Sequence, residues 1–294
     1  MVKPSIYPNL DQLAGYFNVY NGADNHVHLK RWITGLSALP FLIFLVYIGG
    51  YPFVILVGFA CICSLWEYYR IVFNADGKIL YGVVVWWGYF VGLAILVAAH
   101  IAEPESVLVV LALNLVIVGL MSMFLYKSDP SIVDVIPKQV QGIVYIPLLL
   151  SFLVSIRRDP DGMTWIFLLL AIIFAGDISA YYVGSNIGRH KLNPAISPGK
   201  TIEGAVGGLA GNLLVGSIGK IFFLPLLSWG PAVLFFLAVG LAGQVGDLFE
   251  SEFKRSSKIK DSGGILPGHG GFLDRIDALL FASPVAYLFK IYIL

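Results

Sequence analysis

The sequence predicts an all-α polytopic membrane protein with about nine transmembrane helices, and three observations carry this prediction. The 294 residues are 58% hydrophobic and only 13% charged, with a mean hydropathy of +0.83, which is more apolar than a soluble domain of this length. Apolar runs of about 20 residues, the length that crosses a bilayer, recur along the whole chain. Basic residues gather in alternate connecting segments, as in membrane proteins of fixed orientation.

Each predicted helix is an apolar run bounded by polar residues. The first is the shortest, and the residues before it have no compact apolar region of the kind found in a cleavable signal peptide. We therefore expect the first helix to be an uncleaved membrane anchor. In chain order the predicted spans are 32–48, 51–69, 81–101, 106–126, 138–155, 163–187, 202–224, 231–250 and 272–293.

The basic residues predict the orientation of these helices. With a cytoplasmic N-terminus, the inside segments hold 14 of the 19 Lys and Arg residues, whereas the outside loops hold only Arg157 and Arg158. Cytoplasmic loops of membrane proteins carry such an excess of positive charge. We therefore expect the N-terminus inside and the C-terminus outside.

Composition divides the chain into three predicted parts. A polar cytoplasmic segment, 1–31, precedes a transmembrane scaffold of about five helices, 32–160, which has few intramembrane polar groups. Residues 161–294 are predicted to form a catalytic transmembrane domain of about four helices, because most polar residues at helix ends lie there. Two predicted cytoplasmic loops, 188–201 and 251–271, belong to this part.

The segment 197–203, SPGKTIE, leads from the first of these loops into a predicted helix. It lacks the GxxxxGK[ST] spacing and the strand–helix context of a Walker A motif, so we reject that motif. Lys200 beside a helix N-terminus still suits an anion. Within the helix, Gly204/Gly208 and Gly207/Gly211 have the spacing that lets helices approach closely in lipid, and we assign them to packing.

Acidic and basic residues also mark the ends of the last two predicted helices. Asp247, Glu250, Ser251 and Lys254 share one helix face by their spacing, and Asp274 and Asp277 share a face at the start of the last helix. The intervening loop is long enough to bring the two helix ends together. Asp247 and Asp274 are therefore predicted to bind Mg²⁺ together with waters and substrate phosphates. For each acid taken alone, the alternative to metal binding is a structural role as a helix cap or in a salt bridge.

Two further features leave alternatives open. The glycines at 263, 264, 268, 270 and 271 leave backbone amides unshielded, which suits phosphate oxygens at a helix N-terminus, although a loop without function would also be rich in glycine. Asp177 lies inside the predicted span 163–187. A structural hydrogen-bonding role and a position lining a site are equally open for it.

The run from Ser251 to Asp277, SEFKRSSKIKDSGGILPGHGGFLDRID, resembles the signature of the phosphatidate cytidylyltransferases, also called CDP-diacylglycerol synthases. The preceding GDLFES, the SPGKTIEG loop and the DISAYYVG segment are also similar to that family. The N-terminal KRWITGLSALP and the number of helices resemble its bacterial members. The resemblance therefore covers most of the chain.

This resemblance implies the reaction of CTP with phosphatidate to give CDP-diacylglycerol and pyrophosphate in phospholipid biosynthesis. It implies Mg²⁺, with or without a second cation, and a homodimer among membrane lipids, with no nucleic acid as partner. It also implies a multi-pass protein of the bacterial inner (cytoplasmic) membrane with a cytoplasmic active site. The lipid phosphate is largely dianionic at neutral pH, so it needs no general base, and positioning and cations lower the barrier.

The resemblance also implies roles for individual residues. The basic residues would neutralise phosphates, and the carboxylates of Asp247 and Asp274 would bind the metal. The expected catalytic residues are Asp247, Lys254, Asp274 and Arg275. The expected substrate-binding residues are Asp177, Ser197, Lys200, Thr201, Glu203, Ser251, Arg255, Lys260, Asp261, His269 and Asp277.

Two other classes of function compete with this interpretation. A proton-coupled transporter could use Asp177, Asp247 and Asp274 as a relay, but it predicts acids near mid-membrane and paired repeats, whereas these acids lie at predicted cytoplasmic ends. A related lipid-modifying transferase, such as a polyprenol kinase or the archaeal-lipid cytidylyltransferase, is the other alternative. The long C-terminal signature favours the phosphatidate cytidylyltransferases over both.

Overall fold

The computed structural model describes residues 39–73, 82–101, 105–259, 261–264 and 270–293. Within these residues the chain is all-α apart from one small hairpin, and seven helices are long and apolar enough to cross a membrane. A shorter apolar helix, Leu39–Ile48, precedes them. The other elements are α2 (Gly50–Val72), α4 (Val83–Ile101), α5 (Glu105–Leu125), α6 (Ile132–Ile143), η1 (Val144–Leu148), α7 (Leu149–Arg158), α8 (Gly162–Ile187), α9 (Ile202–Phe223), α10 (Trp229–Ser256) and α11 (Leu273–Tyr292).

These elements confirm the predicted fold class, and each predicted span corresponds to a helix in the described part of the chain. The residues 32–38 of the first span lie outside the described residues. α10 extends six residues beyond its predicted end, so Asp247 and Lys254 share one continuous helix. The predicted division of the chain at residue 160 stays a prediction.

The predicted span 138–155 is a longer rod, Ile132–Arg158, with a π-helical turn in its middle. Pro147 lies in this turn. Proline has no amide hydrogen and its ring clashes with the carbonyl four residues earlier, which disfavours a regular α-helical turn. The wider π turn accommodates Pro147 and lets α6 and α7 continue as one transmembrane segment.

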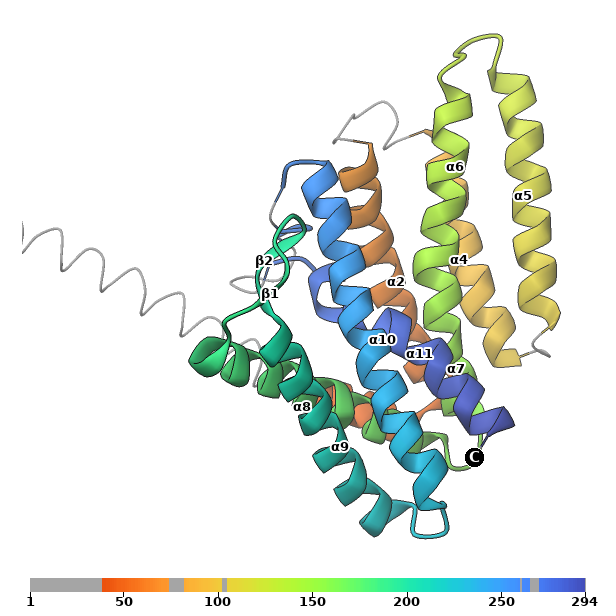
Figure 1. The fold of residues 1–294 in the computed structure, drawn as a ribbon. Coiled ribbons are helices and arrows are strands. Elements are labelled where there is room, and N and C mark those ends of the chain that lie inside the picture. The colour runs from red at the N-terminus through yellow and green to blue at the C-terminus, as the bar shows by residue number, and fades with distance from the viewer. Residues whose placement is uncertain (1–38, 74–81, 102–104, 260, 265–269, 294) are drawn as a thin grey trace, which may run out of the picture.

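α10 and α11 lie between two groups of helices (Figure 1). α8 and α9 lie side by side on one flank, and α4, α5 and α6 form the other. α10 packs against both α9 and α11, and α11 also packs against α7. The C-terminal part of the chain therefore meets the N-terminal part along α11, which packs against α7 and also touches α2.

Glycines on α9 explain the close packing of α8 and α9. A Cβ atom at Gly207 would lie 2.6 Å from the Cβ atom of Val183, and one at Gly211 would lie 2.9 Å from the carbonyl oxygen of Ala175. Such distances are shorter than van der Waals contact, so side chains at these positions would force the helices apart. The structure thus agrees with the assignment of these glycines to packing.

The loop 188–201 contains a hairpin that the sequence analysis did not predict. Strand β1 (Lys191–Asn193) pairs antiparallel with β2 (Ser197–Thr201). The hairpin lies at the same end of the helices as the α5–α6 turn and the C-terminal end of α10 (Figure 1). It places the SPGKT segment beside the end of α10.

At the opposite end of the helices, polar contacts join α11 and α7 to neighbouring segments. The Nζ atom of Lys290 on α11 lies 2.6 Å from the carboxylate of Asp159 and 2.9 Å from that of Asp161, both in the α7–α8 turn. The guanidinium of Arg157 donates to the carbonyl oxygens of Val46 (2.7 Å) and Tyr47 (2.8 Å). Arg157 therefore caps the C-terminus of the Leu39–Ile48 helix, whose last carbonyls have no partner within the helix.

Candidate active site

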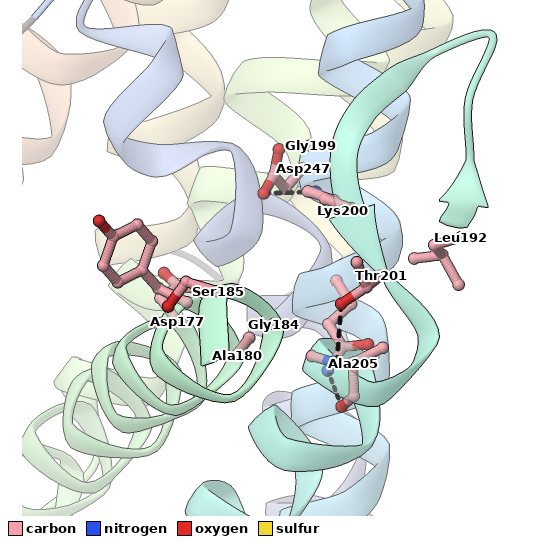
Figure 2. Close-up of a pocket in the computed structure, with 13 residues that line it drawn as sticks. Asp177, Ala180, Gly184, Ser185, Leu192, Gly199, Lys200, Thr201, Ala205 and Asp247 are labelled. Atoms are coloured by element: carbon pink, nitrogen blue, oxygen red, sulfur yellow. Dashed lines mark hydrogen bonds and ion pairs between the residues drawn. The ribbon is translucent and has the colours of Figure 1, made fainter. Parts of the chain in front are cut away.

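A pocket of about 450 Å³ opens between α8, α9, α10 and the hairpin. Lys200 and Asp247 point toward each other across it, and their Nζ and carboxylate oxygen atoms are 2.5 Å apart (Figure 2). Both side chains remain about one-third exposed, at 28% and 36%. Asp177 lines the pocket from α8. A cation and two carboxylates from three separate elements thus share one open cavity.

Local structure explains why Lys200 reaches this pocket. Lys200 is the penultimate residue of β2, and Thr201 is the N-cap of α9, with its Oγ1 atom accepting from the amide of Gly204 at 3.1 Å. Threonine is a favoured N-cap residue because its hydroxyl replaces a missing helical acceptor. On α10, Gln244 donates to the carbonyl oxygen of Ala205 at 2.9 Å. This contact holds the Asp247 turn against α9.

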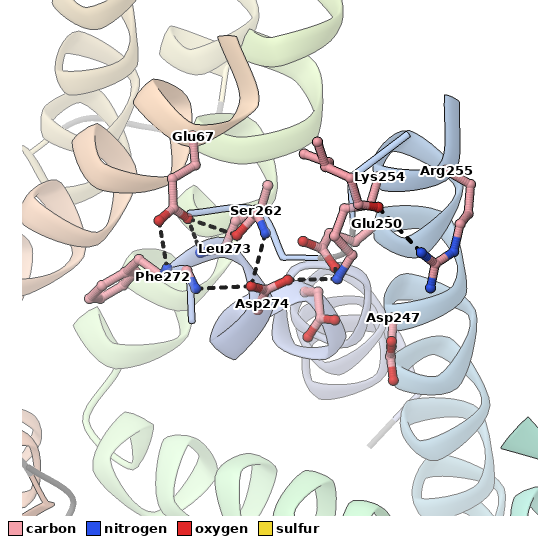
Figure 3. A network of polar contacts seen from close by, with 12 residues as sticks. Glu67, Asp247, Glu250, Lys254, Arg255, Ser262, Phe272, Leu273 and Asp274 are labelled. Carbon is pink, nitrogen blue, oxygen red and sulfur yellow. Dashed lines mark hydrogen bonds and ion pairs between the residues drawn. The ribbon is translucent and has the colours of Figure 1, made fainter. Parts of the chain in front are cut away.

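A second, more buried cluster lies at the start of α11. Lys254 forms ion pairs with Glu250 and Asp274, and its Nζ atom is 2.6 Å from Asp274 Oδ1 (Figure 3). Asp274 Oδ2 accepts from the amides of Ser262 (3.1 Å) and Gly271 (2.9 Å). The side chain of Glu250 is fully buried. Buried ionic groups in proteins are generally paired, as Lys254 is here.

Glu67 on α2 completes this cluster, and the sequence analysis missed it. Its fully buried carboxylate accepts from the Ser262 hydroxyl (3.0 Å) and from the amides of Phe272 (3.0 Å) and Leu273 (2.8 Å) (Figure 3). The sequence signal was a carboxylate inside an apolar helix, which marks a candidate functional residue. Glu67 occupies first-turn amides of α11 that the sequence analysis had considered for substrate phosphate.

The structure brings six predicted residues into these two clusters. Asp177, Lys200, Thr201 and Asp247 line the pocket, and Lys254 and Asp274 belong to the second cluster. The pocket-lining interpretation of Asp177 therefore fits its position.

Three predicted residues, one each on the hairpin, α9 and α10, have other contacts. The Glu203 carboxylate accepts from the amides of Arg189 (3.0 Å) and His190 (3.1 Å), and it lies 2.6 Å from His190 Nδ1. Arg255 donates to the carbonyl oxygen of Ile196 at 3.0 Å. Both side chains hold the hairpin in place, and Ser197 pairs with Asn193 in its ladder. Substrate contacts of these residues stay predictions.

The remaining predicted residues are spread around the clusters. Ser251 and Asp277 are buried, and Arg275 is exposed in the first turn of α11. Asp261 lines a separate cavity of about 430 Å³ beside the end of α2. Lys260 and His269 lie outside the described residues.

The comparison with known proteins decides the family. The cytidylyltransferase family matches residues 29–293 of this chain. The chain belongs to this family. A phosphatidate cytidylyltransferase of Bacillus subtilis is 32% identical over 265 residues, covering 88% of this chain and 96% of the relative. A phosphatidate cytidylyltransferase of Thermotoga maritima is 36% identical over 196 residues, covering 64% of this chain and 71% of the relative.

For a cytidylyltransferase, the open pocket offers a suitable donor set for Mg²⁺. Mg²⁺ prefers carboxylate oxygens and usually keeps several waters. Asp247 and Asp177 present such oxygens in one cavity, whereas the oxygens of Asp274 accept from Lys254 and two amides. Across the described residues, no three His, Cys, Asp or Glu side chains gather as a metal site. An ion here would therefore take few protein ligands and complete its shell with water and phosphate oxygens.

Proposed function

We propose that this protein transfers the cytidylyl group of CTP to phosphatidate and releases CDP-diacylglycerol and pyrophosphate, a step of phospholipid biosynthesis. The observation that carries this proposal is the similarity over 96% of the length of the Bacillus subtilis phosphatidate cytidylyltransferase. The pocket supports it, because it combines Lys200 with two carboxylates, Asp177 on α8 and Asp247 on α10.

The reaction requires two anions to meet. An oxygen of the lipid phosphate forms a bond to the α-phosphorus of CTP, and the bond from that phosphorus to the bridging oxygen of pyrophosphate breaks, with the electron pair leaving on pyrophosphate. The phosphate monoester is largely dianionic at neutral pH, since its second pKa is near 6. The protein therefore needs no general base, and its task is to position the substrates and to neutralise charge.

The two clusters divide this task in our proposal. Lys200, now paired with Asp247, exchanges that partner for a substrate phosphate, because both side chains are accessible from the pocket. Asp247 would hold Mg²⁺, with or without a second cation, and a bound ion would neutralise phosphate charge. Asp274, the other predicted metal ligand, would reach the ion only by exchanging its contact with Lys254. Lys254 and Arg275 supply positive charge near the reacting phosphates.

We further propose that the protein resides in the bacterial inner membrane as a homodimer among membrane lipids, with its active site in the cytoplasm. The concentration of Lys and Arg in the predicted inside segments supports this orientation. The hairpin, which carries Lys200, belongs to one of these segments. The homodimer rests on the family resemblance.

Purified protein incubated with phosphatidate, Mg²⁺ and CTP labelled at the α-phosphate tests the proposal. The expected product is a labelled liponucleotide together with unlabelled pyrophosphate. CTP labelled at the γ-phosphate should leave the lipid unlabelled, whereas a lipid kinase would transfer that label to its acceptor. Diacylglycerol in place of phosphatidate is the matched control, because it lacks the attacking phosphate. Labelling of lipid only by the γ-phosphate would contradict the proposed reaction.

A further inference from the structure

Glu67 links the N-terminal half of the protein to the second cluster. It lies on α2, 195 residues before Ser262 and 206 residues before Leu273 in sequence. Its carboxylate is fully buried and accepts three hydrogen bonds from these residues and Phe272. Charge-assisted hydrogen bonds of this kind are stronger than those between neutral groups. Glu67 therefore fixes both the segment 261–264 and the first turn of α11.

Ser262 connects this carboxylate to Asp274. The Ser262 hydroxyl donates to Glu67 at 3.0 Å, and the amide of the same residue donates to Asp274 Oδ2 at 3.1 Å. Asp274 in turn contacts Lys254 at 2.6 Å. A displacement of Glu67 would therefore move one donor of Asp274 directly and the helix turn that carries Asp274 as well.

We propose that Glu67 is a positioning residue that sets the orientation of the Asp274 carboxylate for the cytidylyl transfer. This inference rests on the proposed role of Asp274 in the active site. Residues that orient a reactive or metal-binding group often affect catalysis 10- to 100-fold without touching the substrate. Glu67 is not among the residues that line the open pocket.

The glycines of the loop fit around Glu67. A Cβ atom at Gly263 would lie 2.8 Å from the Cδ atom of Glu67, and one at Gly271 would lie 2.7 Å from its Oε2 atom. These two positions require glycine because the loop backbone wraps closely around the carboxylate. Glu67 thus accounts for two glycines that the sequence analysis considered for phosphate binding.

Glu67→Gln tests the proposal, because glutamine preserves the shape of the side chain but presents an NH₂ group to amide donors. We expect kcat to fall about 10- to 100-fold, whereas KM for CTP and for phosphatidate stays within about threefold, since losing an interaction that stabilises only the transition state lowers kcat. Hydrogen exchange provides a readout besides activity. The amides of Phe272 and Leu273 should exchange faster in the variant, while those of α8 remain unchanged.

Ser257→Ala is the matched control. The Ser257 hydroxyl also joins this region to α2, donating to the carbonyl oxygen of Ile71 at 2.9 Å, but it has no contact with Asp274. Its kcat should stay within about twofold of the wild type. Ser262→Ala removes only the hydroxyl donor to Glu67. We expect a fall in kcat of about three- to tenfold, which corresponds to the free energy that one hydrogen bond contributes.

Three outcomes would overturn the inference. They are a folded Glu67→Gln protein with kcat within twofold of the wild type, an equal loss in Ser257→Ala, or full activity of Asp274→Asn, which would also remove Asp274 from the proposed site. An inactive Asp274→Asn beside a fully active Glu67→Gln would overturn the positioning role alone. If Glu67→Gln does not fold, the test rests on Ser262→Ala. A kcat of Ser262→Ala equal to that of the wild type would then contradict the proposal.

Discussion

Two lysine–aspartate pairs of different burial define the candidate site at the scale of residues. The side chains of Lys200 and Asp247 are 28% and 36% exposed, whereas those of Lys254 and Asp274 are 11% and 13% exposed. An accessible pair can exchange partners with a charged ligand, because water and ligand reach both groups. A buried pair is retained, because breaking it leaves an uncompensated charge. The open pair therefore suits substrate exchange and the closed pair suits a fixed framework.

Asp247→Asn should lower turnover by at least about 10-fold, because the change removes a proposed carboxylate ligand, and even residues behind the ligands have effects of this size. Folding should remain intact, since Asp247 is partly exposed and its described ion pair is with Lys200 alone. Initial rates at varied Mg²⁺, together with the melting temperature in detergent, provide the measurement.

Asp134→Asn, in the exposed first turn of α6, serves as the control for this experiment and should behave as the wild type. Near-normal activity of Asp247→Asn at ordinary Mg²⁺ would remove Asp247 from the metal site.

Lys200→Ala should raise KM for CTP or phosphatidate about 10-fold with a smaller change in kcat. Lys200 adjoins the N-terminus of α9, where an anion already gains from backbone amides and the helix dipole, so its charge contributes to binding in the ground state and the transition state alike. Steady-state kinetics with both substrates varied would measure this. Lys191→Ala is the control, because Lys191 is exposed on β1 and does not line the pocket. A fall in kcat with both KM values unchanged would refute the assignment.

At the scale of elements, the close contact of α8 and α9 sets the shape of the pocket. Asp177 on α8 and Lys200 before α9 share the cavity only because glycines let the two helices approach. Hydropathy predicted both helices, and the four-residue spacing of the glycines predicted a packing surface on α9 but not its partner. The hairpin of β1 and β2 was not predictable, because its strands are only three and five residues long and the longer one, SPGKT, has no alternation of polar and apolar residues.

Gly211→Ala should destabilise the protein by about 1–3 kcal/mol, the usual cost of inserting atoms into a packed interface. The added methyl group would lie 2.7 Å from the Cβ atom of Ser179 on α8. Gly119→Ala on α5 is the matched control, since a Cβ atom there meets nothing within 4 Å among the described residues. Thermal unfolding in detergent should show a lower melting temperature for Gly211→Ala only. Equal melting temperatures for the two variants would contradict a packing role for Gly211.

At the scale of the whole molecule, the sequence predicted more of the fold than of the site. Long apolar runs report membrane helices directly, because the bilayer requires them. The carboxylates on α10 and α11 were predicted because their spacing places them on shared helix faces on either side of one loop. Glu67 was not, since its partners lie about 200 residues away and only the folded chain brings them together.

The orientation of the molecule gives a further prediction. A cysteine at exposed Ser256, in a chain with Cys61 and Cys63 replaced by alanine, should react with a membrane-impermeant thiol reagent only in broken cells or inverted vesicles. The reason is that the C-terminal end of α10 belongs to a predicted inside segment rich in Lys and Arg. A cysteine at Leu226, which is 99% exposed in the α9–α10 turn, is the control and should react in intact cells. Labelling of Ser256→Cys in intact cells would contradict both the orientation and the cytoplasmic site.

The contact of Lys290 with Asp159 and Asp161 bears on how the protein is made. α11 carries four charged residues, and it is not among the seven described helices that are apolar enough to cross a membrane by themselves. Charged residues oppose insertion of an isolated helix, so α11 depends on helices synthesised earlier to receive it. The two carboxylates after α7 have no contact with Lys290 until α11 has been synthesised and has packed. α11 therefore completes polar contacts at both ends of the helices, since it also carries Asp274 at its other end.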